Sequence, residues 1–293
     1  MRKCFSILVL FSSFFVEAQS FQWWAQTVNW DGVSHWNKYL ITTSAYMGPN
    51  ALPVPFINTG SIDSVHSFGI SGNFHFSKGD KTQNAVMYAN YCLVKNIISF
   101  DASWIPFEHY RMDHATKEKR HVYSNDYYNS RAIGDVHLNT NIQLLNKVRN
   151  KIHVALRIGY RIPTSGDLGS ARYTDAPGYY FDAGLAKPLG KKKEWKWLNM
   201  AGFYVWQTYR PEHRQDDAFL YGSGFEWNNA KWKMQSYFTG YIGYEEGDKP
   251  ILLRGTLERN GKKFNQLLRL QQGLHDFNYT SAELGLRYVF GKN

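Results

Sequence analysis

Alternation of apolar and polar residues is the main pattern of this chain, and it runs from about residue 65 to the C-terminus. In the last such segment, residues 281–290, Leu284, Leu286 and Tyr288 alternate with small or polar residues. A period of two is that of a β-strand with one apolar and one polar face. The segment therefore predicts a strand that is buried on one side only.

Eleven earlier segments share this alternation, which gives twelve predicted strands. They cover residues 67–76, 84–93, 98–104, 136–144, 152–162, 179–187, 197–209, 219–227, 231–244, 251–258 and 264–274. Residues 197–209 are the least regular, because both faces are apolar. The polar faces carry mainly Ser, Asn, Gln, Gly, His and Tyr, whereas soluble sandwiches and lipocalin-like barrels expose a face rich in Lys, Glu and Asp. The pattern predicts an antiparallel barrel with an apolar exterior and a polar lumen.

Composition agrees with strands, and not helices, as membrane-spanning elements. Aromatic residues make up 17% of the chain and the mean hydropathy is −0.47. After residue 18 there is no run of about 20 apolar residues, the length that a transmembrane helix requires. A barrel tolerates a low mean hydropathy because its strands are apolar on one face. A soluble all-β protein would have the same composition and is the alternative.

Residues 1–18 predict a cleaved signal peptide. Two basic residues precede the apolar run 5–16, and Val-Glu-Ala at 16–18 fits a small-x-small cleavage site. The mature chain then starts at Gln19 and keeps one cysteine, Cys92, which excludes an intramolecular disulfide and a multi-cysteine metal site. Export also argues against nucleic acid as a partner, although the formal net charge is +10.

Residues 19–64 differ from the rest and predict an irregular segment. Four Trp occur within residues 22–36, and three Pro occur within residues 49–55. Proline fixes φ and lacks the N–H that a sheet needs, so this stretch is extended chain outside the sheet. We expect it to fill the lumen as a plug, to cap the periplasmic mouth or to bind a partner.

The closing strand ends at Phe290, almost at the C-terminus, and resembles the last strand of bacterial outer-membrane β-barrels. Such strands end in Phe or Trp and act as the insertion signal for the barrel-assembly machinery; the tail 291–293 is a departure. Residues 161–180 also look similar to loops of uncharacterised Bacteroidota outer-membrane proteins. The resemblance implies an all-β transmembrane antiparallel barrel of about twelve strands over residues 65–293. It further implies an outer-membrane location and contact with membrane lipid and lipopolysaccharide.

Charged residues on the predicted inward faces are the candidate functional residues. They favour either an anion-selective pore lining or a salt-bridge network that braces the lumen and anchors residues 19–64; the second interpretation is favoured because buried charges are normally paired. In the loop 164–178, Arg172 is expected to pair with Asp175 or to fold back into the lumen. The candidate pore-lining residues are Asp101, His137, Arg157, Arg161, Asp182, Glu226, Lys233, Arg254, Glu258, Arg269, Glu283 and Arg287.

The long polar stretch 108–134 suggests a solvated basic loop. Its three histidines, His109, His114 and His121, lack a zinc spacing, and no metal or cofactor is predicted. Its four cations are expected to meet anionic lipopolysaccharide: Arg111, Lys117, Lys119 and Arg120.

The predicted function is an outer-membrane, porin-like channel for passive or facilitated passage of small solutes, with anions as one candidate class. One alternative is a barrel enzyme acting on lipid. It would use Asp135 and His137 as the best acid–base pair, but the chain has no Gly-x-Ser-x-Gly motif. The other alternative is a non-transporting barrel that binds a partner through residues 19–64 or the outer loops.

Overall fold

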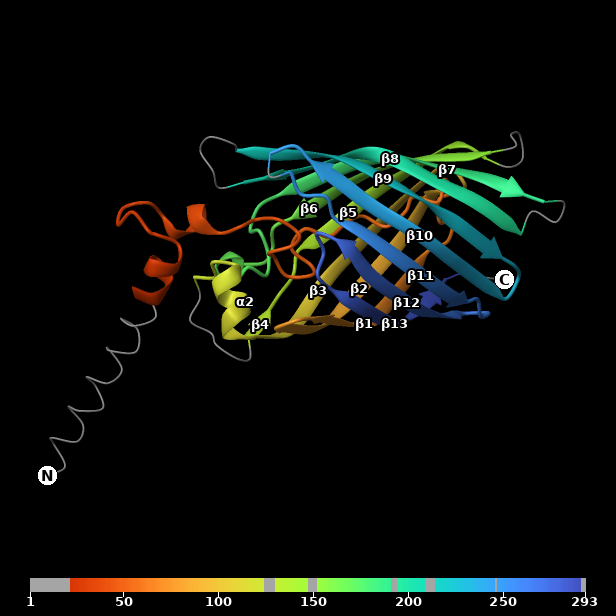
Figure 1. Cartoon of the computed structure of the whole chain (residues 1–293). Coiled ribbons are helices and arrows are strands. Elements are labelled where there is room, and N and C mark those ends of the chain that lie inside the picture. The colour runs from red at the N-terminus through yellow and green to blue at the C-terminus, as the bar shows by residue number, and fades with distance from the viewer. Residues whose placement is uncertain are drawn as a thin grey trace, which may run out of the picture.

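The chain forms a closed antiparallel β-barrel (Figure 1) in a computed structural model that describes residues 22–123, 130–146, 152–190, 194–208, 214–245 and 247–290. The signal-peptide prediction lies outside the described residues. Each strand of the ring pairs with its neighbours in sequence, and β1 pairs with β13 to close it. The twelve strands of the ring are β1 Ser67–Ser77, β2 Asp80–Val94, β3 Ile98–Met112, β5 Val136–Leu145, β6 His153–Ile162, β7 Gly178–Leu189, β8 Trp195–Gln207, β9 Gln215–Asn228, β10 Trp232–Gly243, β11 Ile251–Arg259, β12 Phe264–His275 and β13 Thr280–Val289.

The predicted fold of twelve strands is confirmed, with one correction at residues 108–134. The prediction of a loop there is wrong for its first residues, because β3 continues to Met112 and is followed by α2 (His114–Lys119) and the short strand β4 (Ser130–Ala132). β4 pairs only with the last part of β3. Inward residues still alternate there, since Glu108, Tyr110 and Met112 are buried, but the outward residues are polar.

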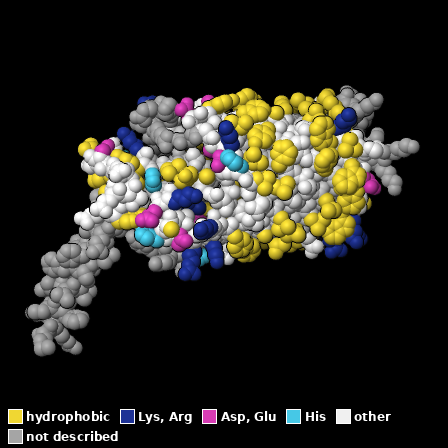
Figure 2. Space-filling model, in the orientation of Figure 1, with side chains coloured by type: hydrophobic (Ala, Val, Ile, Leu, Met, Phe, Trp, Pro, Cys, Tyr) yellow, Lys and Arg dark blue, Asp and Glu magenta, His cyan; other side chains and the backbone are white. Residues whose placement is uncertain are grey.

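Apolar side chains point out of the barrel, as the alternation predicts. Phe68 and Ile70 of β1 and Leu284 of β13 are exposed, whereas Ser67 and Ser281 are buried. Figure 2 shows apolar side chains over most of the visible wall, with most charged side chains gathered toward the end where α2 lies. We call this the loop end, and the end that holds the C-terminus the turn end (Figure 1). In the described part of the chain, no helix has the length and apolarity needed to cross a bilayer.

Residues 22–66 begin at the loop end, pass through the barrel and reach the turn end, where β1 starts (Figure 1). At the loop end, residues 22–27 are helical, and the indole N–H of Trp23 donates to Glu118 of α2 at 3.1 Å. At the turn end, Gly60 has φ +67°, and a Cβ there would lie 2.8 Å from backbone atoms of β6 and β7. Only glycine fits this close approach without strain. We call residues 48–58 the lumen segment.

Candidate functional site

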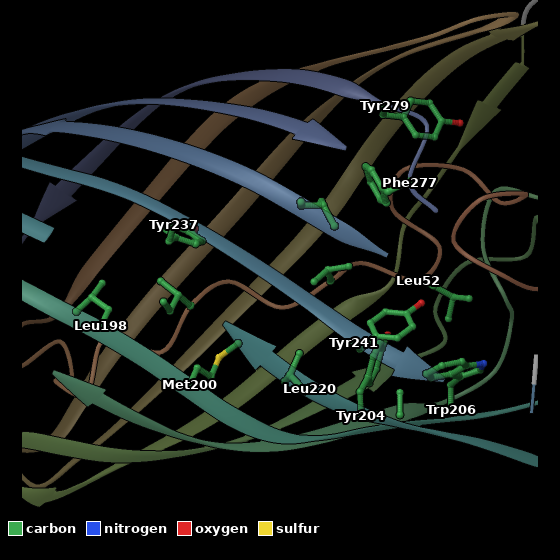
Figure 3. Close-up of a cluster of buried hydrophobic side chains, with 14 of the residues drawn as sticks. Leu52, Leu198, Met200, Tyr204, Trp206, Leu220, Tyr237, Tyr241, Phe277 and Tyr279 are labelled. Carbon is green, nitrogen blue, oxygen red and sulfur yellow. The ribbon is translucent and has the colours of Figure 1, made fainter. Parts of the chain in front are cut away.

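One side of the lumen is apolar and packs against the lumen segment. Inward residues of β8, β9 and β10, including Met200, Leu220 and Tyr241, form one buried cluster with Leu52 and Val54 (Figure 3). Burial of this kind of apolar surface contributes roughly 25 cal/mol per Å². The cluster explains why residues 197–209 are apolar on both faces: one face is exterior wall, and the other holds the lumen segment.

The backbone of the lumen segment is held by arginines of the barrel wall, on β6 and β11. Its prolines and lack of sheet pairing leave carbonyl oxygens that must find other donors. Arg254 of β11 donates to Val54 O at 2.7 Å and to Pro55 O at 3.0 Å. Arg157 of β6 donates to the carbonyl of Phe56 at 2.7 Å. We call these contacts, with the bond from Arg161 to the carbonyl of Ala51, the arginine clamp.

Carboxylates next to the clamp balance most of its charge. Arg157 lies 2.8 Å from Asp182, which also accepts from Asn58 of the lumen segment at 2.8 Å. Arg161 lies 3.9 Å from Asp135, and burial raises the pKa of that carboxyl. Arg254 has no carboxylate among its hydrogen-bond partners; its remaining donors bind Thr239 and Gln271.

A second ionic group joins the wall to the chain just before β1. Arg287 of β13 contacts Asp63 at 2.6 Å and Glu258 at 2.7 Å. Arg269 of β12 pairs with Glu283 of β13. The contact between Arg287 and Asp63 fixes the chain just before β1 to β13, the strand with which β1 closes the barrel.

A third group closes the loop end around Arg172, which is fully buried. Of the two expected arrangements, Arg172 folds into the barrel: it contacts Asp80 at 2.7 Å and Glu108 at 2.8 Å. Burial opposes its charge, but these two carboxylates hold the pKa of Arg172 well above its usual value. Asp175 instead accepts from the backbone N–H of Leu168 at 3.1 Å and shapes the loop.

The basic-loop prediction needs correction at two residues. Lys117 is buried, and Arg120 is buried against Asp80 at 2.6 Å. Arg111 and Lys119 are exposed. In the part of the chain that the structure describes, no group of His, Cys, Asp or Glu is placed to hold a metal ion.

A cavity of about 480 Å³ lies between the lumen segment and the remaining wall. It is lined by residues of β1–β3, β5–β8 and β11–β13, together with residues that include Asn50, Phe56 and Asp63. Phe56 keeps 45% of its surface exposed there, with the guanidinium carbons of Arg254 and Arg269 at 4.6 and 4.1 Å from its ring centre. The lumen is therefore divided into a packed side and an open polar side.

The twelve candidate pore-lining residues divide between this cavity and other places. Eight of them line it: Asp101, His137, Arg157, Arg161, Arg254, Arg269, Glu283 and Arg287. Two others contact lining arginines without lining the cavity themselves: Asp182 contacts Arg157 at 2.8 Å, and Glu258 contacts Arg287 at 2.7 Å. Glu226 and Lys233 form a separate group near the turn end, where Glu226 contacts Lys196 at 2.7 Å and Lys233 at 3.5 Å.

Sequence reasoning does not select Asp80 and Glu108, the acids that hold Arg172 at the loop end. Glu108 falls in a predicted loop, although its spacing from Tyr110 and Met112 continues the inward alternation of β3. Asp80 stands at a turn, and nothing local distinguishes it from a solvated residue. Asp135, the proposed acid of an acid–base pair, faces Arg161 and accepts from Ser165 N at 3.2 Å.

The comparisons with known proteins identify a fold class. No protein-family model and no curated protein sequence matches the chain. A solved outer membrane channel from Pseudomonas putida F1 is similar, with a TM-score of 0.54 at 11% identity over 82% of this chain and 100% of that one. The NanC porin has a TM-score of 0.51 at 9% identity, covering 75% of this chain and 98% of that one. The chain therefore has the fold of outer-membrane β-barrel proteins.

Proposed function

We propose that this protein is an outer-membrane channel that passes small polar solutes between the lumen segment and the polar side of the barrel wall. The observation that carries the proposal is the length of the cavity. Both Ser67, at the turn end of β1, and His75, near its loop end, line the cavity. At roughly 3.3 Å per residue, these positions are about 26 Å apart along the strand. The cavity thus follows most of the length of β1.

The proposed orientation places the loop end outside the cell. In transmembrane barrels the periplasmic turns are short and the outer loops are long, and α2, β4 and the ordered loop 163–177 all belong to the loop end. Arg111 and Lys119 then face the lipopolysaccharide layer, and residues 22–47 lie at the cell surface. The fold supports outer-membrane insertion, since a closed ring satisfies its backbone hydrogen bonds internally.

Conductance of the purified mature chain, residues 19–293, in planar bilayers tests the proposal. We expect discrete conductance steps. Asn73 lines the cavity, whereas a side chain added at its neighbour Gly72 would meet open space. Asn73→Trp should therefore lower the conductance, and Gly72→Trp, which adds the same ring outside, should leave it unchanged. Absence of conductance steps in the parent protein, or equal effects of the two variants, would refute the proposed route.

A further inference from the structure

We infer that the lumen cavity binds an uncharged, polyhydroxylated solute of about mono- or disaccharide size in preference to a free anion. This inference rests on the proposed channel function, because it names the class of solute that the channel admits. It is carried by the charge balance of the cavity, by the hydrogen-bonding atoms left without partners, and by the shape of the lining.

The charges that line the cavity are already compensated among the described residues. Five arginines line it, four of which have a carboxylate within 4.0 Å: Arg157, Arg161, Arg269 and Arg287. The fifth, Arg254, uses its donors on four oxygen atoms. Asp101 adds a further carboxylate to the lining and accepts from the amides of Asn139 and Asn141, at 2.6 and 2.7 Å. An anion would have to displace a carboxylate from its partner, which leaves a charge poorly solvated.

The loop end of the cavity holds a donor and an acceptor that lack hydrogen-bond partners. Arg161 is 2% exposed and Asp135 is 1% exposed, yet Arg161 Nε and Asp135 Oδ2 make no hydrogen bond to any residue that the structure describes. These atoms are 3.9 Å apart. His137, which also lines the cavity, lies directly opposite Arg161 in the β5–β6 pairing.

Another acceptor and another donor lie on the two sides of β13. Asn73 Oδ1 on β1 and Arg269 Nε on β12 have no hydrogen-bond partner among the described residues. Both residues are opposite Glu283 of β13 in the sheet register, so they flank it on neighbouring strands.

A hydroxyl group fits such pairs better than an anion does. A hydroxyl donates and accepts at one atom, so one hydroxyl can satisfy Arg161 Nε and Asp135 Oδ2 together, and others can bind Asn73 Oδ1 or Arg269 Nε. A carboxylate or phosphate only accepts, so it would leave Asp135 Oδ2 and Asn73 Oδ1 unsatisfied and would be repelled by Asp135 and Glu283. The donor and acceptor pattern therefore selects a neutral ligand with several hydroxyl groups.

The shape of the cavity agrees with this class of ligand. Its volume of about 480 Å³ is within the range of roughly 300–1,000 Å³ typical of small-molecule sites. Aromatic side chains lie among the amides and charges, including Phe56, Tyr88 and Tyr180. Such surfaces contact the C–H groups of a sugar ring while the polar groups orient its hydroxyls.

Calorimetric titration of the mature chain in detergent micelles tests the inference with three probes of one ring shape: glucose, glucuronate and glucosamine. We expect glucose to bind about tenfold or more tightly than either charged probe, a difference of about 1.4 kcal/mol. Asn73→Leu removes the unpaired acceptor at nearly constant volume and should weaken glucose binding severalfold. Gln266→Leu makes a similar polar-to-apolar change at an exposed position of β12 and should leave binding unchanged.

Conductance measured on the same samples distinguishes failure of the proposed solute preference from failure of the proposed channel function. A protein that conducts but binds glucuronate as tightly as glucose, or binds none of the probes, overturns the inference and leaves the channel in place. Glucose binding that is insensitive to Asn73→Leu also overturns it, because the ligand would then lie elsewhere. Selective glucose binding without conductance would support the site and refute the channel. A heat-dependent shift in gel mobility confirms that each variant is a folded barrel.

Discussion

Arg254 Nη2 donates a 2.7 Å hydrogen bond to the carbonyl oxygen of Val54, which lies 200 residues earlier in the chain. The bond joins β11 to the lumen segment, and Val54 packs its side chain into the apolar cluster, which includes Leu252 of the same strand. Val54 is thus held twice, by burial of its side chain and by a charged donor to its carbonyl oxygen.

Loss of this donor should loosen the lumen segment. Hydrogen bonds to charged groups are worth about 1.5–3 kcal/mol each, and Arg254 makes two of them to the segment. We expect Arg254→Met to increase single-channel conductance and current noise in planar bilayers. Arg259→Met alters an exposed arginine at the turn end of the same strand and serves as the control. Unchanged currents in both variants would mean that the clamp does not limit the pore.

Removal of the segment should widen the pore. The barrel closes through the pairing of β1 with β13, which does not involve residues 22–58. A mature chain that lacks these residues is therefore expected to form a heat-modifiable barrel with severalfold larger conductance. Conductance equal to that of the full chain would contradict occlusion by the segment.

The buried Arg172 should be essential for stability. Arg172→Met would leave Asp80 and Glu108 buried without this partner, and breaking a buried ion pair costs about 3–5 kcal/mol. Urea-induced unfolding, followed by tryptophan fluorescence in lipid vesicles, measures the loss. Arg131→Met on β4 replaces an exposed arginine and should change stability by less than about 0.5 kcal/mol. Equal effects of the two variants would refute the assigned role.

Asp248, in the loop between β10 and β11, should make the barrel less stable as the pH rises through about 6. Burial raises the pKa of this carboxyl to about 6 from the ordinary value of 3.8. Between these pH values the folded protein keeps a proton that the unfolded chain has released. Stability is therefore highest below about pH 4 and declines as the pH rises toward 6, by at most about 3 kcal/mol for this group.

Urea midpoints measured between pH 4 and 7 test this dependence on Asp248. Asp248→Asn keeps the hydrogen bond from Tyr241 available and should remove this part of the pH dependence. Asp217→Asn provides a control, because it makes the same change at a half-buried aspartate of β9. A pH profile identical in the parent and in Asp248→Asn would show that another group is responsible.

The path of residues 22–66 and the proposed orientation together predict that residue 22 lies at the cell surface. An epitope inserted between residues 21 and 22 should bind antibody on intact cells. An epitope placed after Asn293, beyond β13 at the turn end, should bind only after the outer membrane is permeabilised. The reverse pattern would show that the loop end faces the periplasm.

The sequence by itself determined the barrel, because the period of two is a local property of each strand. The spacing of apolar residues such as Phe68, Ile70 and Leu284 identifies the outer face of each strand. Because an open sheet would leave unpaired backbone groups at its edges in the membrane, the twelve strands must form a closed ring. It also selected Arg157, Arg161, Arg254 and Arg269 as inward charges, since alternation gives the direction of a side chain.

Only the tertiary structure decided what those inward charges contact. The partners of Arg254 are backbone carbonyls of Val54 and Pro55, which carry no side-chain signal, and they come from a segment whose prolines predict only irregular chain. Whether an inward residue meets the cavity, as Asp101 does, or is covered, as Asp182 is, depends on where that segment crosses the lumen. This crossing is set by long-range packing of Leu52 and Val54 against β8–β10, and not by any local pattern.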